Sequence, residues 1–174
     1  MLHKVGVPLI IVRAKETREE SDKVGLFSRI LVPLDASERG AAILPYVAEL
    51  TKKLESEVTL LRVVEPGKHV HTIGGLDYIP FLDRDINSAE TRAQRYLNEV
   101  SSQFVGTKTK TRSEFRVGDA AREIIKLATE KGSSLIAMSS HGHGLSGIEA
   151  WAYGSVTGKI LQTGRHSVML VPSL

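Results

Sequence analysis

Four glycines and a serine near the C-terminal end of the chain form its strongest chemical pattern. The glycines, Gly142, Gly144, Gly147 and Gly154, fall within thirteen residues, and Ser155 follows directly. Glycine lets a backbone approach a ligand closely because no Cβ intervenes. Ser155 is predicted to open a helix, and the N–H groups and dipole of a helix N-terminus favour anions. The pattern predicts an anion site, with Ser155 either capping the helix or donating to a phosphate oxygen; glycines that only shape a turn are the alternative.

Two named phosphate motifs nearly match this segment, and both fail on spacing. The glycines from Gly142 to Gly147 fit the letters of a dinucleotide loop, which also needs an acidic residue about 20 residues later. The only acid after Gly147 is Glu149. The stretch from Gly154 to Lys159 has three residues between its glycines instead of four, and no Ser or Thr follows the lysine, so it is not a P-loop.

Two histidine pairs offer metal-binding nitrogen atoms. They are His69 with His71 and His141 with His143, and neither pair has an acidic neighbour. The chain contains no cysteine, which excludes disulfides, thiolate metal sites and cysteine nucleophiles. We therefore expect loop histidines and no metal site. A metal-dependent hydrolase built on these pairs is the least favoured class of function.

The elements that must position these residues alternate between strand and helix from Arg29 onward. Short β-branched or apolar runs predict strands, and apolar residues at helical spacing predict helices. Strands are expected at 30–34, 57–64, 109–117, 135–138 and 168–171, and helices at 37–54, 86–104, 119–131 and 155–163. Pro45 should kink or delay the first helix, and Asp119 should cap the third.

This alternation predicts an α/β fold: an open parallel sheet with helices on both faces, joined by right-handed crossovers. Lys108, Lys110 and Arg112 alternate with small polar residues, which is typical of an edge strand protected by charge. A stripe that contacts phosphates is the alternative. Ligands of such sheets bind beyond the carboxyl ends of the strands, where the strand order reverses. Asp35 and the glycine segment both follow strand ends.

Composition narrows the class of protein. The 174 residues and 19.0 kDa suit one domain, and 41% hydrophobic and 25% charged residues are typical of a globular chain. A net charge of +3 gives no general affinity for nucleic acid despite a pI of 9.2. No apolar run approaches the ~18 residues that a membrane span needs. We expect a cytoplasmic protein that binds neither membrane nor nucleic acid.

The first 28 residues stand outside this alternation. Met1–Val12 aligns without gaps with Ile160–Val171, and both read as a helix end, a turn and an apolar strand. The sequence thus predicts an extension at 1–28 that resembles the last helix and strand of a preceding repeat, plus a charged linker, before a domain at 29–174. An unrelated short strand is the alternative.

Six blocks in order resemble the universal stress protein family. They are Ile30–Glu38, Val58–Pro66, Val117–Ile125, Leu135–Gly142, Tyr153–Val156 and Ser167–Val171. The resemblance implies an adenine nucleotide alpha hydrolase-like fold, with a five-stranded parallel sheet in the order 3-2-1-4-5. The resemblance is also consistent with residues 29–174 being the C-terminal part of a tandem-domain member.

Nucleotide-binding members of the family resemble one another in a G-x2-G-x9-G-(S/T) loop after the fourth strand. In the register that we prefer, Ser139 takes the place of the first glycine and Gly142 that of the second, while Gly154 and Ser155 match the last pair. The loop is then two residues longer than the pattern. Counting from Gly144 restores the spacing but puts His141 in the place of the first glycine.

The family resemblance also implies roles for single residues. Asp35 would contact the ribose, and Val64 and Met138 would border the adenine. Phosphates would be held at the loop and the following helix, where the candidate residues are Ser139, His141, Gly142, Gly144, Gly154, Ser155 and Val156. The implied ligand is ATP, ADP or AMP, with or without Mg²⁺.

Binding with slow or absent hydrolysis is the expected activity. Hydrogen bonds to a charged group contribute about 1.5–3 kcal/mol each, so a handful supports micromolar affinity, about −8 kcal/mol. Phosphoryl transfer also needs charge neutralisation, and no lysine lies within 139–155. The alternative is a nucleotide-free dimeric scaffold. The resemblance implies a homodimer through Val168–Val171, and Val7–Val12 could compete for that edge or add to it.

Overall fold

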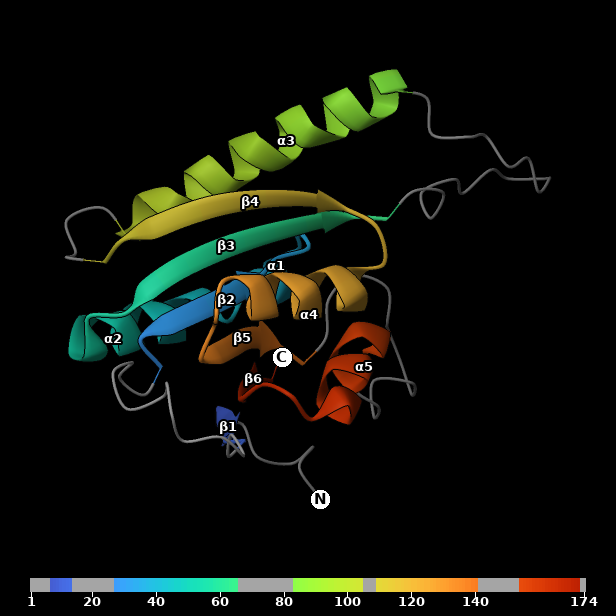
Figure 1. Cartoon of the computed structure of the whole chain (residues 1–174). Coiled ribbons are helices and arrows are strands. Elements are labelled where there is room, and N and C mark those ends of the chain that lie inside the picture. Colours follow the sequence, from blue (N-terminus) through green and yellow to red (C-terminus); the bar gives the residue numbers. More distant parts are fainter. Residues whose placement is uncertain (1–6, 14–26, 66–82, 105–108, 141–153, 173–174) are drawn as a thin grey trace.

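In the part of the chain that the structure describes, six strands form a single sheet (Figure 1). The computed structural model describes residues 7–13, 27–65, 83–104, 109–140 and 154–172. The strands in these ranges are β1 (Leu9–Ile11), β2 (Arg29–Pro33), β3 (Glu57–Val64), β4 (Thr111–Val117), β5 (Leu135–Ser139) and β6 (Val168–Val171). Their spatial order is β1-β6-β5-β2-β3-β4.

The strand order expected from the sequence is confirmed, and the strand count is corrected. The strands β4-β3-β2-β5-β6 are parallel neighbours, which is the expected order 3-2-1-4-5. A sixth strand, β1, pairs antiparallel with β6. An edge strand presents a row of unpaired backbone N–H and C=O groups. The apolar strand β1 pairs with these groups of β6.

The helices also follow the predicted pattern, with one break. They are α1 (Glu38–Ala41), α2 (Leu44–Leu54), α3 (Asp83–Ser101, continued by a 3₁₀ turn at Ser102–Phe104), α4 (Ala120–Glu130) and α5 (Ser155–Thr163). The helix expected at 37–54 is two helices, because Pro45 can stand in the first turn of α2 but not in the interior of a longer helix.

Two clusters of buried side chains lie on opposite faces of the sheet. One joins α2 and α3 to the sheet through residues such as Val47, Leu60 and Leu97. The other joins α4 and α5 to the sheet through residues such as Leu61 and Ile124. Leu60 and Leu61 are neighbours in β3 that face opposite sides, as the two-residue period of a strand requires. The result is a sheet covered by helices on both faces (Figure 1).

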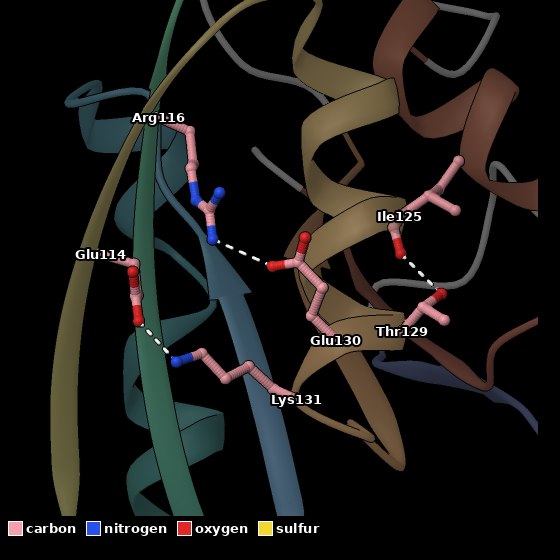
Figure 2. A network of polar contacts seen from close by, with 6 residues as sticks. All are labelled: Glu114, Arg116, Ile125, Thr129, Glu130 and Lys131. Atoms are coloured by element: carbon pink, nitrogen blue, oxygen red, sulfur yellow. Dashed lines mark hydrogen bonds and ion pairs between the residues drawn. The ribbon is translucent and has the colours of Figure 1, made fainter.

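The predicted edge position of β4 is confirmed, and its charged residues are tied to α4. Arg116 Nη2 lies 3.0 Å from Glu130 Oε2, and Lys131 Nζ lies 2.7 Å from Glu114 Oε1 (Figure 2). Directly before β4, Lys110 Nζ lies 3.4 Å from Glu57 Oε1 of β3. Charges along this strand therefore join the edge to its neighbours.

No helix among the described residues combines the length and the apolar character that crossing a membrane requires.

Candidate functional site

The strand order reverses between β2 and β5. From β2 the chain continues outward through β3 to β4, and it then returns to add β5 and β6 on the other side of β2. Open α/β sheets bind ligands at such a switch point, outside the carboxyl ends of the strands. Asp35 follows the end of β2, and Ser139 ends β5. The sheet thus brings together two segments that are about a hundred residues apart in sequence.

A cleft of about 320 Å³ opens at this point, which is within the range of small-molecule sites, roughly 300–1,000 Å³. Its lining comes from the ends of three strands and the starts of three helices. The lining residues are Pro33, Leu34, Asp35, Gly40, Leu61, Arg62, Val63, Glu65, Ala120, Ile124, Met138, Ser139, Gly154, Ser155, Val156 and Thr157. Aliphatic side chains make up much of the wall, and the polar groups gather at a few positions.

The carboxylate of Asp35 is held by its own turn. Asp35 Oδ1 accepts hydrogen bonds from the Ser37 backbone N–H at 3.0 Å and from Ser37 Oγ at 2.6 Å. Ala36 bridges the two residues with φ at 63°, a left-handed conformation that is uncommon outside glycine. A Cβ at Gly40 would overlap Asp35 Oδ1. The acid therefore has one well-defined position at the end of β2.

Arg62 supplies a positive charge beside Asp35. Its Nη1 donates to the Leu34 carbonyl oxygen at 3.3 Å. Burial lowers the pKa of Arg62, while the nearby Asp35 and Tyr96 act in the opposite direction; a guanidinium stays charged at neutral pH even so. Burial also raises the pKa of Tyr96, and the charge of Asp35 adds to that rise. Asp35 and Arg62 both line the cleft, and Tyr96 of α3, which packs against the core, interacts electrostatically with both.

The N-terminus of α4 is filled by carboxylates. Asp119 is its N-cap, as the sequence predicted, and Asp119 Oδ1 accepts from the Arg122 backbone N–H at 3.0 Å. Glu65, which follows β3, accepts from the Ala120 backbone N–H at 2.9 Å. Both carboxylates accept hydrogen bonds from first-turn N–H groups, which have no partner within the helix.

The N-terminus of α5 is built differently. Gly154, not Ser155, is its N-cap, and no side chain caps the helix. The Gly154 N–H donates to the Ser140 carbonyl oxygen at 3.2 Å, and Thr157 Oγ1 lies 3.4 Å from the same oxygen. The capping alternative for Ser155 is therefore wrong, because the helix begins one residue earlier than a serine cap requires. Ser155 is exposed in the first turn and lines the cleft.

Most of the described candidate residues line this one cleft. Asp35, Met138, Ser139, Gly154, Ser155 and Val156 all do so. Val64 is buried and is not among the lining residues, whereas Val63 is. Val63 faces the same side of β3 as Leu61, which also lines the cleft. The contact of Val64 with a base stays a prediction. The candidates His141, Gly142 and Gly144 lie outside the described residues.

Sequence reasoning missed several residues of the cleft. Arg62 is a charged residue within an otherwise β-branched and apolar strand, and Glu65 directly follows that strand. A charged residue at or near the end of an apolar strand is the same signal that singled out Asp35. Gly40, Ala120 and Ile124 had no such signal, because only the packing of their helices brings them to the cleft.

The groups that line the cleft offer three kinds of contact. Aliphatic walls suit a flat apolar group, carboxylates accept hydrogen bonds from hydroxyls, and the first turn of α5 presents backbone donors to an anion. Within the described ranges, no three His, Cys, Asp or Glu residues are grouped as a metal site would need. His69, His71, His141 and His143 lie outside these ranges.

A mostly parallel, doubly wound sheet with a cleft at its switch point and a helix N-terminus opening into that cleft defines a doubly wound α/β domain. The model of the universal stress protein family matches residues 26–172, and the chain belongs to this family. It is 28% identical over 149 residues to universal stress protein YxiE of Bacillus subtilis, covering 84% of this chain and 99% of the relative. It is 32% identical over 157 residues to universal stress protein Sll1654 of Synechocystis, covering 88% and 91%.

Solved structures share the fold. A universal stress protein in complex with cAMP superposes with a TM-score of 0.62 at 15% identity, covering 86% of this chain and 99% of that one. A universal stress protein from Archaeoglobus fulgidus in complex with dAMP gives 0.55 at 16% identity, covering 84% and 98%. Another universal stress protein from Archaeoglobus fulgidus gives 0.63 at 18% identity, covering 99% of this chain but 52% of that one.

Proposed function

We propose that this chain binds an adenine nucleotide in the cleft between β2 and β5 and acts as a stress-response or regulatory module with slow or no hydrolysis. One observation carries the proposal: α5 begins at the cleft without a side-chain cap, while the Asp35 carboxylate is fixed in the same cleft. The complexes of two family structures with cAMP and dAMP support the same class of ligand.

Each part of a nucleotide has a matching group. Met138 and Val63 offer apolar contact to the base, and Asp35 can accept hydrogen bonds from ribose hydroxyls. The N–H groups of Ser155 and Val156, in the first turn of α5, suit a phosphate. ATP, ADP and AMP are the proposed ligands, with or without Mg²⁺, and the loop residues His141, Gly142 and Gly144 remain candidates for further phosphate contacts.

Slow hydrolysis is expected because the described cleft offers no cation at its phosphate end. Lys159 of α5 is engaged elsewhere, with its Nζ 2.9 Å from Asp119 Oδ2. Arg62 lies near Asp35 at the ribose end. Backbone donors alone support affinity, but they do not neutralise the charge that develops during phosphoryl transfer.

Calorimetric titration with ATP, ADP and AMP tests the proposal through the first residue of α5. Ser155→Pro removes one backbone N–H and the hydroxyl at the helix position that accepts proline best, and the extended Gly154 before it (φ −51°, ψ 150°) is compatible with a following proline. Ser155→Ala, the matched control, keeps the N–H. We expect Ser155→Pro to weaken binding by at least about tenfold, which is about 1.4 kcal/mol, and Ser155→Ala to weaken it less.

A second pair of variants addresses the backbone itself. Gly154→Val adds a branched side chain at the cleft and should also weaken binding at least about tenfold. Gly158→Val adds the same side chain one turn later in α5, where a Cβ meets nothing within 4 Å, and should bind like the unmodified chain. Unchanged affinity in both Ser155→Pro and Gly154→Val, or no binding of any of the three nucleotides, would overturn the proposal.

The alternative function is a nucleotide-free dimeric scaffold. Native mass spectrometry of freshly purified protein distinguishes the two functions, because only the nucleotide-binding protein would retain bound nucleotide. A homodimer through Val168–Val171 requires β1 to leave the edge of β6, where it pairs within the chain. The cytoplasmic location stays a prediction from the sequence.

A further inference from the structure

A second concave surface, a groove of about 670 Å³, lies between α4 and α5. These two helices cover the same face of the sheet (Figure 1). The groove is lined by residues of both helices and by Arg165, which follows the end of α5. None of its lining residues also lines the cleft at the switch point. The groove is therefore a separate surface, and its chemistry can be considered independently of a nucleotide.

Positive charge is in excess in this groove. The carboxylates that line it are Asp119 and Glu130. The side chains that bring positive charge to it are all exposed, and they are Arg122, Lys126, Lys159 and Arg165. Exposed cations of this kind attract negatively charged partners and repel positively charged ones.

Both carboxylates of the groove are already engaged. Asp119 Oδ2 lies 2.9 Å from Lys159 Nζ, and Glu130 Oε2 lies 3.0 Å from Arg116 Nη2 of β4 (Figure 2). No ion pair between described residues involves the other three cations. The groove thus presents three positive charges that a partner can pair, and they belong to Arg122, Lys126 and Arg165.

The deeper part of the groove is aliphatic. Ala121 is buried and Ile125 is half-buried. The Thr129 hydroxyl donates to the Ile125 carbonyl oxygen at 2.9 Å (Figure 2), and the Thr163 hydroxyl donates to the Ile160 carbonyl oxygen at 2.7 Å. Because these hydroxyls are bonded within their own helices, the groove combines apolar contact at its buried positions with positive charge at its exposed positions.

We propose that this groove is a docking surface for an acidic segment of a partner protein, in which Asp or Glu residues stand beside aliphatic ones. Arg122 and Lys126 are one helical turn apart, about 6 Å along α4, which matches two carboxylates one turn apart on a partner helix. The aliphatic residues of the segment cover Ala121 and Ile125, and its carboxylates pair with the cations. An apolar centre with a charged rim is the usual construction of a protein interface.

The distribution of charge along α4 favours a protein segment over a nucleic acid or an anionic membrane. Asp119, Arg122, Lys126 and Glu130 follow one another at intervals of three to four residues, so a negative charge stands at each end of the stripe. A phosphate chain or a lipid surface carries charge throughout and would meet both carboxylates. It also has no aliphatic side chain for the buried positions. A protein segment can place its charges opposite the cations alone.

A synthetic peptide tests the proposal on the full chain. The probe is a helical peptide of alanine, leucine and glutamate whose glutamates are four residues apart, and its control has glutamine in place of glutamate. In calorimetric titration without nucleotide, we expect the acidic peptide to bind and the control peptide to bind at least about tenfold more weakly. The affinity should fall as salt is added, because interactions between exposed charges are screened over roughly 8–10 Å.

Charge reversal on α4 locates the binding surface. Arg122→Glu with Lys126→Glu should weaken binding of the acidic peptide at least about tenfold. The matched control, Arg95→Glu with Lys53→Glu, makes the same change in net charge at exposed residues of α3 and α2, on the other face of the sheet, and should bind like the unmodified chain. Circular dichroism checks that both are folded. Arg122→Gln with Lys126→Gln replaces the reversal if it does not fold.

Three results would contradict the proposal. The first is an acidic peptide that does not bind the unmodified chain. The second is equal affinity in the reversed variant and its control. The third is a DNA duplex or a vesicle with phosphatidylserine that binds more tightly than the peptide and loses binding in the reversed variant, which would assign the groove to phosphates. Nucleotide titration of the reversed variant should give unchanged affinity, so this proposal and the proposed function fail separately.

Discussion

The helices α4 and α5 begin beside each other at the carboxyl edge of the sheet, and their first turns are completed in different ways. At α4, Asp119 and Glu65 accept hydrogen bonds from two backbone N–H groups of the first turn. At α5, the glycine cap has no side chain to offer, and its own N–H is bound to the Ser140 carbonyl oxygen. The ion pair between Lys159 and Asp119 joins the two helices.

This difference separates a structural helix start from one suited to a ligand. Both starts carry the same partial positive charge and the same excess of backbone donors. At α4 the protein supplies the anions itself, so an external anion would have to displace a carboxylate. At α5 the first turn lines the cleft and no capping side chain competes for its N–H groups, which is the difference on which the proposed phosphate site rests.

The largest expected effect comes from Gly40→Ala, which moves Asp35 and leaves both helix starts unchanged. The new Cβ would overlap Asp35 Oδ1 and crowd Ser37 Oγ. We expect the free energy of unfolding to fall by about 1–3 kcal/mol and nucleotide affinity to fall about tenfold or more, measured by urea denaturation and calorimetry. Gly158→Ala, which adds a methyl group in open space, should be neutral or stabilising by up to about 1 kcal/mol.

Alanine substitutions at the two helix starts should have opposite effects on stability and on nucleotide affinity, both of moderate size. Asp119→Ala removes an N-cap and should lower the free energy of unfolding by about 1 kcal/mol, with nucleotide affinity nearly unchanged. Ser155→Ala removes no cap and should change stability by less than about 0.5 kcal/mol, while it weakens nucleotide binding. Equal losses of stability in the two variants would show that the starts are energetically alike.

The smallest expected effect concerns the charge of Glu65. In Glu65→Gln an amide oxygen can still accept from the Ala120 N–H, but one of the two negative charges at the start of α4 is lost, and Asp119 keeps the other. We expect a decrease of about 0.3–1 kcal/mol in the free energy of unfolding, which shrinks as salt is added. Urea denaturation at low and at high salt measures it. An undiminished difference at high salt would speak against a dipole effect.

Local patterns predicted the elements of the fold well. The bounds of β3 and β6 coincide with the expected strands, because runs of β-branched and apolar residues end at polar or turn-forming residues. Pro45 marked the break between α1 and α2, and Asp119 marked the start of α4. In each case the deciding interaction lies within a few residues along the chain.

The residues that the sequence did not single out share a different cause. Val63 reaches the cleft because of the face of β3 that meets it, and a shift of one residue exchanges the faces. Glu65 completes the first turn of α4 across 55 residues of sequence. The sequence offered Val7–Val12 as a strand that could compete for the β6 edge or add to it, and the choice between these outcomes depends on the stability of β1 on β6. Such long-range choices leave no local pattern in the sequence.

The two ends of the sheet limit aggregation by different means. At one end, β4 is a seven-residue strand in which Arg112 is exposed and Arg116 is ion-paired with Glu130 of α4, and charge discourages an incoming strand. At the other end, β1 is apolar but spans only three residues, so it offers an incoming chain little backbone to pair with. A substitution that lengthens β1 would therefore present more unpaired backbone to an incoming chain at this end of the sheet.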